Sequence, residues 1–179
     1  MIRRIVVGAA ILVVAAIALV LAIAMTKPDE FVVQRSVRIK AAPEKVYPRL
    51  VDCREWPAWS PWEKLDPAIE RSLSGPASGP GAVYAWKGNR DVGRGRMEIK
   101  DAQAPSRVSI QLDFIEPFEA RNRTEFTLVP GADATEVTWR MSGPSPHVTK
   151  VMSVFFDMDA VIGKDFEAGL ANLKAASER

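Results

Sequence analysis

The residue best suited to acid–base chemistry is Glu63, which lies in the tryptophan-rich segment EWPAWSPWEKLDP. It follows Trp62 directly and lies beside Lys64 and Asp66. A carboxyl group held against indole rings can serve as a general acid or base, because an apolar environment disfavours its charged form. Such catalysis needs a second group, which the sequence does not identify. Glu63 is therefore a candidate catalytic residue, and an ordinary surface glutamate is the alternative.

The other reactive side chains favour structural roles. Cys53 is the only cysteine and His147 the only histidine, which excludes an intrachain disulfide and a metal site built on several histidines. We expect Cys53 to be a small buried side chain. His147 lies in SGPSPHVT, a proline-rich turn rather than a nucleophile elbow, and we expect it at the start of a helix.

Three carboxylates near the C-terminus, Asp157, Asp159 and Asp165, resemble a metal site only when they are read in a line. On a helix Asp157 and Asp159 point about 200° apart, so they do not share an ion. We expect them to be solvated or paired, for example with Lys164. The sequence therefore indicates neither a metal nor a cofactor.

An apolar segment from Ile5 to Met25 carries no charge. At 1.5 Å per residue a helix of this length spans roughly 31 Å, about one hydrocarbon core. We expect residues 5–25 to cross a membrane once, which divides the chain into an anchor (1–26), a linker (27–30) and one domain (31–179). The alternative is a cleaved signal peptide ending near Ala24, although its apolar core would normally run only about 7–15 residues.

The basic residues around this segment bear on its orientation. Arg3 and Arg4 favour a cytoplasmic N-terminus, which places the domain on the extracytoplasmic side of the cell membrane. Basic residues after the segment, Lys27 among them, point the other way. Of the 24 basic residues, 22 follow Arg4 and balance the 22 acidic ones, so the domain is neutral and no basic stripe indicates nucleic acid.

The part after the anchor alternates between apolar and polar residues in several segments, a pattern typical of half-buried strands. In one of them Val108, Ile110, Leu112 and Phe114 share a face. A short helix begins near Pro43, and a second is predicted from about Val148 to the C-terminus. The predicted strands are 31–40, 69–73, 82–87, 93–100, 107–114, 119–129 and 135–142.

This order predicts an α+β fold. One long helix is available to cover the buried face of the sheet, so we expect a curved antiparallel sheet of six to seven strands around a C-terminal helix. Apolar residues form one stripe along that helix, namely Val148, Val151, Phe155, Met158, Ile162, Phe166, Gly169 and Leu173. The prolines of EWPAWSPWEKLDP restrict it to short helical turns, so its tryptophans must point in different directions and serve as a lid or end wall.

Three motifs carry a resemblance to a known superfamily: WPAWSPWEKLDP, AVYAWKGNRDVGRGRMEI and GKDFEAGLANLK. From Phe31 to about Ala176 the chain resembles the SRPBCC superfamily, and within it the polyketide cyclase/dehydrase and lipid-transport group with a START-like helix-grip fold. Such a resemblance implies an apolar cavity between the sheet and the long helix. The superfamily includes lipid carriers, allergens, co-chaperones and cyclases, so the fold alone does not fix the function.

The alternation identifies which side chains would line that cavity. Gly93 and Gly95 share the inner face of their strand, and they either leave room for a ligand or mark a close approach by the helix or a bend in the sheet. Asn122 and Thr124 are either polar groups of the inner wall or wet residues at an open end of the sheet. Arg71, like Arg35, is either a rim residue or a partner for Glu63 or an acidic ligand. The candidate ligand-binding residues are Trp62, Tyr84, Trp86, Gly93, Gly95, Met97, Leu112, Phe114, Asn122, Thr124, Trp139, Met141, Phe155, Met158 and Ile162.

Three functions are compatible with this sequence. The first is membrane-anchored binding or transport of an apolar or amphipathic small molecule such as a lipid. The second is an enzyme of the cyclase or dehydratase kind, which would depend on Glu63, Tyr84 or Asn122. The third is a cell-envelope interaction module that meets a partner protein through Trp56 or Trp59.

Overall fold

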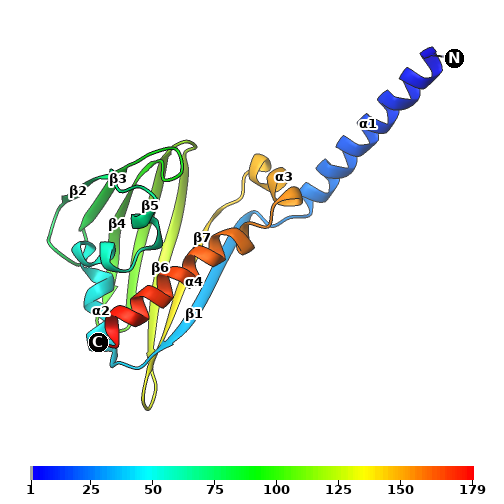
Figure 1. Ribbon diagram of the computed structural model, residues 1–179. Helices are drawn as coiled ribbons and strands as arrows, with labels where there is room; N and C mark the ends of the chain where they lie inside the picture. Colours follow the sequence, from blue (N-terminus) through cyan, green and yellow to red (C-terminus); the bar gives the residue numbers. More distant parts are fainter. Residues whose placement is uncertain (1) are drawn as a thin grey trace. The chain divides into compact units, whose positions relative to one another are not determined.

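The computed structural model describes residues 2–179, and for residues 2–4 and 64 it describes the backbone only. The elements follow one another as one apolar helix, one strand, three short helices, six strands and two helices (Figure 1). In chain order they are α1 (Ile2–Met25), β1 (Glu30–Ile39), α2 (Pro43–Val51), η1 (Cys53–Ala58), η2 (Pro61–Lys64), β2 (Glu70–Ser74), β3 (Val83–Lys87), β4 (Arg94–Gln103), β5 (Arg107–Glu116), β6 (Ala120–Pro130), β7 (Thr135–Pro144), α3 (His147–Phe155) and α4 (Met158–Ser177).

These elements form two compact units. The sheet unit comprises Val32–Gly143 and Asp159–Arg179, and the anchor unit comprises the chain up to Phe31 together with Pro144–Met158. The sheet unit holds α2, η1, η2 and nearly all of the sheet and of α4. The anchor unit holds α1 and α3.

The sheet has seven strands in the order β1-β7-β6-β5-β4-β3-β2, as Figure 1 shows. The predicted α+β fold, an antiparallel sheet with a C-terminal helix across it, is confirmed. In β5, Val108, Ile110 and Leu112 are buried on one face, as alternation along a strand requires. The six strands from β2 to β7 form an antiparallel meander with each strand paired to the next in sequence.

The C-terminal helix α4 packs on the inner face of the sheet through aromatic and small residues. Phe166 stacks on Trp139 of β7 with ring centroids 4.0 Å apart. One turn further along, Gly169 lets the helix approach the same indole closely. At the end of α4, the Lys174 ammonium donates to the Arg38 carbonyl of β1 at 2.7 Å. These contacts hold α4 across the β1–β7 side of the sheet.

Arg35 of β1 joins the other end of α4 to the sheet. Its guanidinium donates to Asp159 at 2.9 Å and to Glu167 at 2.8 Å, and it lies over Gly163. A side chain at position 163 would overlap the guanidinium, so glycine makes room for this pair of ion pairs. Asp159 is therefore paired, as one of the two expected alternatives requires, but its partner is Arg35 rather than Lys164.

The predicted start of the C-terminal helix near Val148 is wrong, because the helix is broken after Phe155 and the long C-terminal helix runs from Met158 to Ser177. Phe156 adopts an extended conformation (φ −127°, ψ 129°), and a new helix begins at Met158. The apolar residues keep their helical spacing on both sides of this break, so the sequence pattern does not indicate that the helix ends there. Val148 is 72% exposed and Phe155 is 65% exposed, and both belong to the anchor unit.

The tryptophans of EWPAWSPWEKLDP point in different directions, as their prolines predict. The segment forms the two short 3₁₀ helices η1 and η2 separated by Trp59 and Ser60. The buried indoles of Trp56 and Trp59 donate to the Leu50 and Arg49 carbonyls of α2 at 3.1 and 3.0 Å. Trp62 is half-buried against Trp139 and Phe166.

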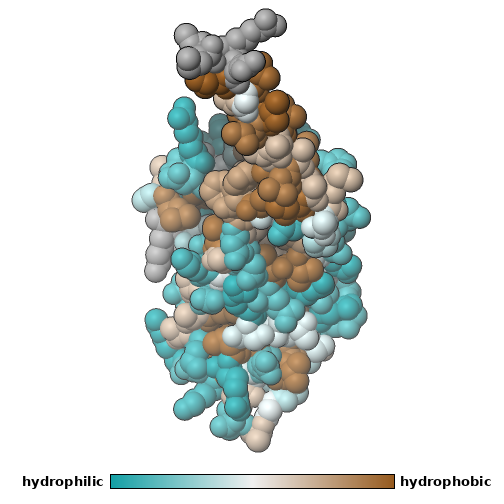
Figure 2. Space-filling model, turned by 90° about the vertical axis from the view of Figure 1, so that its right-hand side faces the viewer, coloured by the Kyte–Doolittle hydropathy of each residue, from teal (hydrophilic) through white to brown (hydrophobic). Residues whose placement is uncertain are grey.

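In the anchor unit, α1 contains a segment, Ile5–Met25, that is long and apolar enough to cross a membrane, and the side chains of its most apolar part are exposed. This helix is a candidate membrane anchor. Figure 2 shows apolar surface gathered on it. The helix α3 packs against α1 within the same unit.

Candidate functional site

The inner face of the sheet carries its side chains in rows that cross the strands. One row places Tyr84 beside Met97, Leu112 and Asn122 on successive strands. The next row places Trp86 beside Gly95 and Phe114. Because residues two apart on a strand share a face, the two rows form one continuous surface on β3, β4 and β5.

The β6–β7 half of this inner face is filled with aromatic rings. Trp139 contacts Phe126, Trp59 and Phe166, with ring centroids 4.9, 5.6 and 4.0 Å apart. All four of these side chains are at most 4% exposed. The Trp139 N–H is buried and has no hydrogen-bond partner among the described residues. The space between α4 and this half of the sheet is therefore occupied by the protein's own side chains.

The β3–β5 half is less covered. Trp86, Met97 and Phe114 are half-buried, and the rings of Trp86 and Phe114 meet edge to face at 6.0 Å. The Trp86 indole donates to the Val92 carbonyl at 3.2 Å, which fixes its orientation. This half presents an apolar surface that remains partly open to solvent.

A polar cluster of Glu63, Arg71 and Tyr84 borders that apolar surface. The Tyr84 hydroxyl donates to Glu63 Oε1 at 2.5 Å, and Arg71 Nε donates to Glu63 Oε2 at 2.7 Å. The side chain of Glu63 is 10% exposed and that of Arg71 is 35% exposed. Of the sequence-based alternatives for Arg71, the structure supports the pairing with Glu63. The carboxylate is thus not an ordinary surface group.

Two members of this cluster, Tyr84 and Arg71, have raised pKa values. Burial, followed by the hydrogen bond to Glu63, raises the pKa of Tyr84 well above its ordinary value of 10.0, so Tyr84 remains a neutral donor. The hydrogen bond to Glu63 raises the pKa of Arg71, which remains a cation. The cluster can therefore hold and orient polar groups, and its charges balance one another.

The sequence indicates Glu63 and Tyr84 as separate candidates and does not predict that they bind each other. Tyr84 comes from β3 and Glu63 from η2, and the two are brought together only by the way η2 folds over the sheet. The neighbouring indole of Trp56, 5.5 Å from the Tyr84 ring, shields the pair from the side of η1. The sequence does indicate one part of this arrangement, because the alternation along the strand places Tyr84 on the inner face of the sheet.

Gly93 and Gly95, which the sequence placed on the inner face with two alternative roles, lie in different surroundings. Gly93 lies outside β4, in a turn with φ +67°, where a side chain would overlap the Glu116 carbonyl. Its predicted place on the inner face of the strand is wrong, because the positive φ interrupts the alternation there. Gly95 does lie on the inner face, but the space beside it is taken by the Trp86 ring, and a side chain would also meet the Asp113 carbonyl at 2.6 Å. The group that approaches Gly95 closely is thus Trp86 of the neighbouring strand rather than the helix, and the register of β4 against β5 shifts between Arg94 and Gly95.

The two polar residues of β6 are buried on the inner face. Asn122 is 7% exposed and faces Leu112 across the ladder, and Thr124 is 4% exposed and faces Ile110 and Met141. The alternative of a wet open end is wrong for both. Met141 is itself buried, at 6% exposure.

The remaining candidates on the two C-terminal helices do not all belong to this surface. Ile162 lies half-buried on α4 in the sheet unit, whereas Phe155 and Met158 belong to the anchor unit. Phe155 is 65% exposed and Met158 is 38% exposed. Whether any of the predicted residues contacts a ligand stays a prediction.

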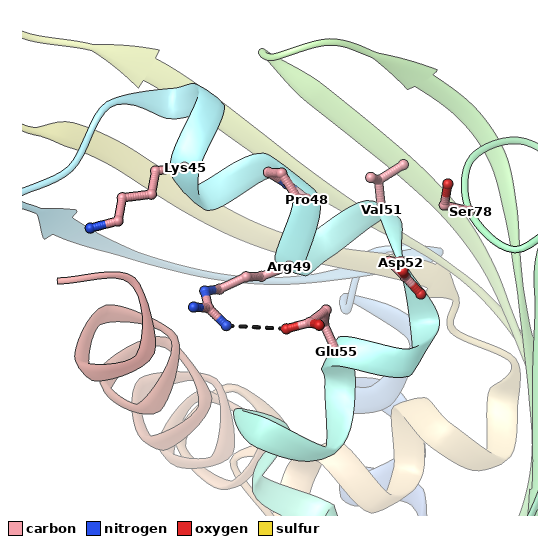
Figure 3. A pocket seen from close by; sticks show the side chains of 7 residues that line it. All are labelled: Lys45, Pro48, Arg49, Val51, Asp52, Glu55 and Ser78. Carbon is pink, nitrogen blue, oxygen red and sulfur yellow. Dashed lines mark hydrogen bonds and ion pairs between the residues drawn. The ribbon is translucent and has the colours of Figure 1, made fainter. Parts of the chain in front are cut away.

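A hollow of about 320 Å³ lies elsewhere in the sheet unit, between α2, η1 and the loop after β2 (Figure 3). Its wall carries both charges, and Arg49 pairs with Glu55 at 3.1 Å across it. None of the predicted ligand-binding residues lines it; the lining residues are Lys45, Pro48, Arg49, Val51, Asp52, Glu55 and Ser78. Among the described residues, no three His, Cys, Asp or Glu side chains gather in a way that would hold a metal ion.

Comparison with known proteins identifies the family. Residues 30–178 match the family described as "Polyketide cyclase / dehydrase and lipid transport". The chain belongs to this family. No curated protein matches the sequence.

Solved structures of similar fold come from functionally diverse proteins. Protein CV1439 from Chromobacterium violaceum is 14% identical over 86% of this chain and 99% of its own, with a TM-score of 0.59. The Aha1 dimer from Colwellia psychrerythraea is 22% identical over 83% and 96%, with a TM-score of 0.58. The di-domain ARO/CYC protein BexL from the BE-7585A biosynthetic pathway is 14% identical over 99% and 60%, with a TM-score of 0.59. At these identities the likeness shows the fold alone.

Proposed function

We propose that this family member binds an apolar or amphipathic small molecule of the lipid class on the β3–β5 half of the inner face. The observation that carries this proposal is the half-buried surface of Trp86, Met97 and Phe114 beside the polar cluster of Glu63, Arg71 and Tyr84. Ligand sites are typically apolar surfaces with a few fixed polar groups that orient the ligand. The family description, which names lipid transport, agrees with it.

The polar cluster indicates which end of the ligand lies where. Glu63 and Arg71 neutralise each other, so the cluster favours a neutral polar end, such as a hydroxyl or carbonyl, over a free ion. The Arg71 guanidinium, which has five N–H groups, can donate a hydrogen bond to such a group, and the Tyr84 oxygen, whose hydrogen is donated to Glu63, can accept one from a hydroxyl. The apolar part would then lie along Trp86 and Phe114.

We further propose that residues 5–25 anchor the protein in the cell membrane, with the linker 27–30 and the domain 31–179 on the extracytoplasmic side. Arg3 and Arg4 before the span support this orientation. A short linker would keep the start of the domain near the membrane, because four extended residues reach at most about 14 Å. Protease added to intact cells should digest the domain, and protection of the domain would reverse the orientation.

The site is tested by photolabelling of the full chain in nanodiscs of synthetic phosphatidylcholine. A fatty acid with a photoactivatable group on its chain is added, and the labelled peptides are identified by mass spectrometry. We expect labelled peptides from β3–β5 in addition to α1, which serves as an internal control for contact with lipid. Labelling of the anchor unit without any in the sheet unit would contradict the proposed site.

Two neighbouring residues of β5 give a matched pair of variants. Phe114→Ala removes a half-buried ring from the inner face, whereas Ile115→Ala removes a side chain, 37% exposed, at the next position of the strand. Successive residues point to opposite faces of a strand. Photolabelling of the sheet unit should fall by about tenfold in Phe114→Ala, as expected for the loss of one good apolar contact, and should not change in Ile115→Ala.

A cyclase or dehydratase activity is the second candidate, and the hydrogen bond from Tyr84 to Glu63 favours it. A carboxylate and a neutral phenol within hydrogen-bond reach can move a proton on a bound polyketide-like chain. This activity predicts that Glu63→Gln and Tyr84→Phe abolish turnover of such a chain while photolabelling of the site persists. Equal turnover in these variants and the unaltered protein would remove the candidate.

A further inference from the structure

The helix α3 presents an apolar face that the described residues of its own unit leave exposed. Val148 is 72% exposed, Met152 is 51% exposed and Phe155 is 65% exposed. At 100° per residue these three side chains fall within about 60° of one another on the helix. Phe156, which follows the helix, is also 60% exposed. Large apolar side chains grouped in this way are typical of a surface that contacts a membrane or another protein.

The opposite face of α3 is fixed to the segment that follows α1. Lys150 points about 200° away from Val148, and its ammonium, with the side chain only 8% exposed, pairs with Asp29 at 2.5 Å. The Ser145 N–H donates to the Asp29 carbonyl at 2.7 Å. Lys150 lowers the pKa of Asp29 through its hydrogen bond and charge, so this ion pair is present at neutral pH. The polar side of α3 is thus turned inward and the apolar side outward.

The position of Asp29 places α3 near the end of the membrane span. Only Thr26, Lys27 and Pro28 separate Asp29 from Met25, the last residue of α1. Four extended residues span at most about 14 Å, so an ion pair at Asp29 keeps α3 within that reach of the hydrocarbon. In addition, α3 packs directly against α1. The exposed apolar face is therefore continuous with the membrane-spanning surface.

We propose that α3 is a second membrane contact, an amphipathic helix that lies in the interface of the bilayer spanned by α1, with Val148, Met152 and Phe155 buried among the lipids. This inference rests on the anchor part of the proposed function and is independent of its ligand. Interfacial helices of this kind bury their apolar face about 5–10 Å into the boundary between head groups and acyl chains. The Asp29–Lys150 pair would then fix the height of α3 relative to the span.

Fluorescence quenching in nanodiscs of phosphatidylcholine and phosphatidylglycerol tests this placement. A thiol-reactive NBD fluorophore is attached to the full chain at Met152→Cys, with Leu12→Cys in the span and Ala132→Cys in the β6–β7 turn as references. Cys53 can stay, because it is buried and its surroundings raise the pKa of its thiol to about 11. All three labelled positions are in exposed residues, so the labels should not disturb packing.

We expect lipids with a nitroxide near the head group to quench the label at position 152 at least about threefold more than the label at position 132, as for other interfacial helices. Aqueous iodide should show the reverse order. If iodide quenches both labels equally, α3 lies in water and the inference is wrong. Protection of position 152 from both quenchers would also overturn it, because a second copy or another protein would then cover the helix.

The label at position 12 separates failure of this inference from failure of the anchor. Nitroxides near the end of the acyl chains should quench it, and if they do not, α1 does not span and the proposal for α3 fails with it. Photolabelling of β3–β5 is unaffected by either result. A failed ligand site and a failed interfacial helix are therefore distinguishable.

Discussion

The two halves of the sheet's inner face differ in what covers them. On β6 and β7, Trp139 is enclosed by Phe126, Trp59 and the α4 residue Phe166. On β3 to β5, Trp86 and Phe114 are only half-buried, and a polar cluster lies beside them. Both halves carry aromatic residues at inward positions. The difference shows that residue type and parity place a side chain on the inner face, whereas the overlying helix decides whether it becomes core or an accessible surface.

The largest expected effect comes from removing the central indole of the filled half. Trp139→Ala should lower the free energy of unfolding by about 3–5 kcal/mol, because it leaves a cavity among four other rings. Trp86→Ala, in the open half, should cost about 1–2 kcal/mol, because its side chain is already partly in contact with water. Denaturant unfolding of the full chain in micelles, followed by circular dichroism, measures both. Equal losses would mean that the halves are packed alike.

A smaller effect is expected where α4 approaches the same indole. In Gly169→Ala the added methyl group would lie 2.7 Å from the Trp139 ring and 3.1 Å from Pro61, so one of these groups must shift. We expect a loss of about 1–3 kcal/mol in unfolding free energy, although alanine is the better helix former. The control is Ala168→Gly at the exposed preceding position, which measures helix propensity alone. Stabilisation by Gly169→Ala would show that the Trp139 ring or Pro61 can shift without loss of packing, which would contradict this prediction.

The polar cluster of the open half should contribute less than the aromatic core. Glu63→Gln removes the charge that Arg71 pairs with, and we expect a loss of about 1–2 kcal/mol, since Arg71 is partly solvated. Asp133→Asn breaks the exposed pair with Arg38 and should change stability by less than about 0.5 kcal/mol. Thermal melts of the two variants side by side provide the measurement. Indistinguishable melts would indicate that burial adds nothing to the Glu63–Arg71 pair.

The smallest effect appears only at high pH. Tyr84 and Tyr47 are the only tyrosines, and burial raises the pKa of both above the ordinary value of 10.0. A raised folded-state pKa stabilises the neutral phenol, so this contribution is complete below pH 10 and is lost as the pH rises further. Ultraviolet titration of tyrosinate should show neither residue ionising near pH 10 in the folded protein. A step near pH 10 that disappears in Tyr84→Phe would contradict the burial of that hydroxyl.

Much of the fold could be predicted from local patterns. The alternation of Val108, Ile110 and Leu112 predicts β5, and Pro43 predicts the start of α2. The break between α3 and α4 could not be predicted in this way, because the apolar stripe passes through Phe155 and Met158 without interruption. The turn at Gly93 could not be predicted for a similar reason. Its positive φ ends the strand in the structure, but the apolar and polar residues alternate in the sequence as if the strand continued.

The sequence predicts several residues of the candidate site but not how they pair. The position of Glu63 after Trp62 marked it as unusual, and parity placed Tyr84 and Asn122 on the inner face. Their relation could not be predicted, because the hydrogen bond between Tyr84 and Glu63 joins residues 21 positions apart on different elements. Pairing of this kind depends on how η2 folds over β3, which no local pattern encodes.

The sequence by itself determined the apolar span, the strands and the inward parity of the aromatic residues, because these depend on hydrophobicity and on the two periodicities of the backbone. The tertiary structure alone decided which tryptophans are core, which carboxylate is paired and which face of α3 stays uncovered. Those outcomes depend on contacts between segments distant in the chain, such as Trp139 with Phe166 and Lys150 with Asp29. The pattern of apolar and polar residues permits many contacts between side chains, and close packing in the folded protein selects one of them.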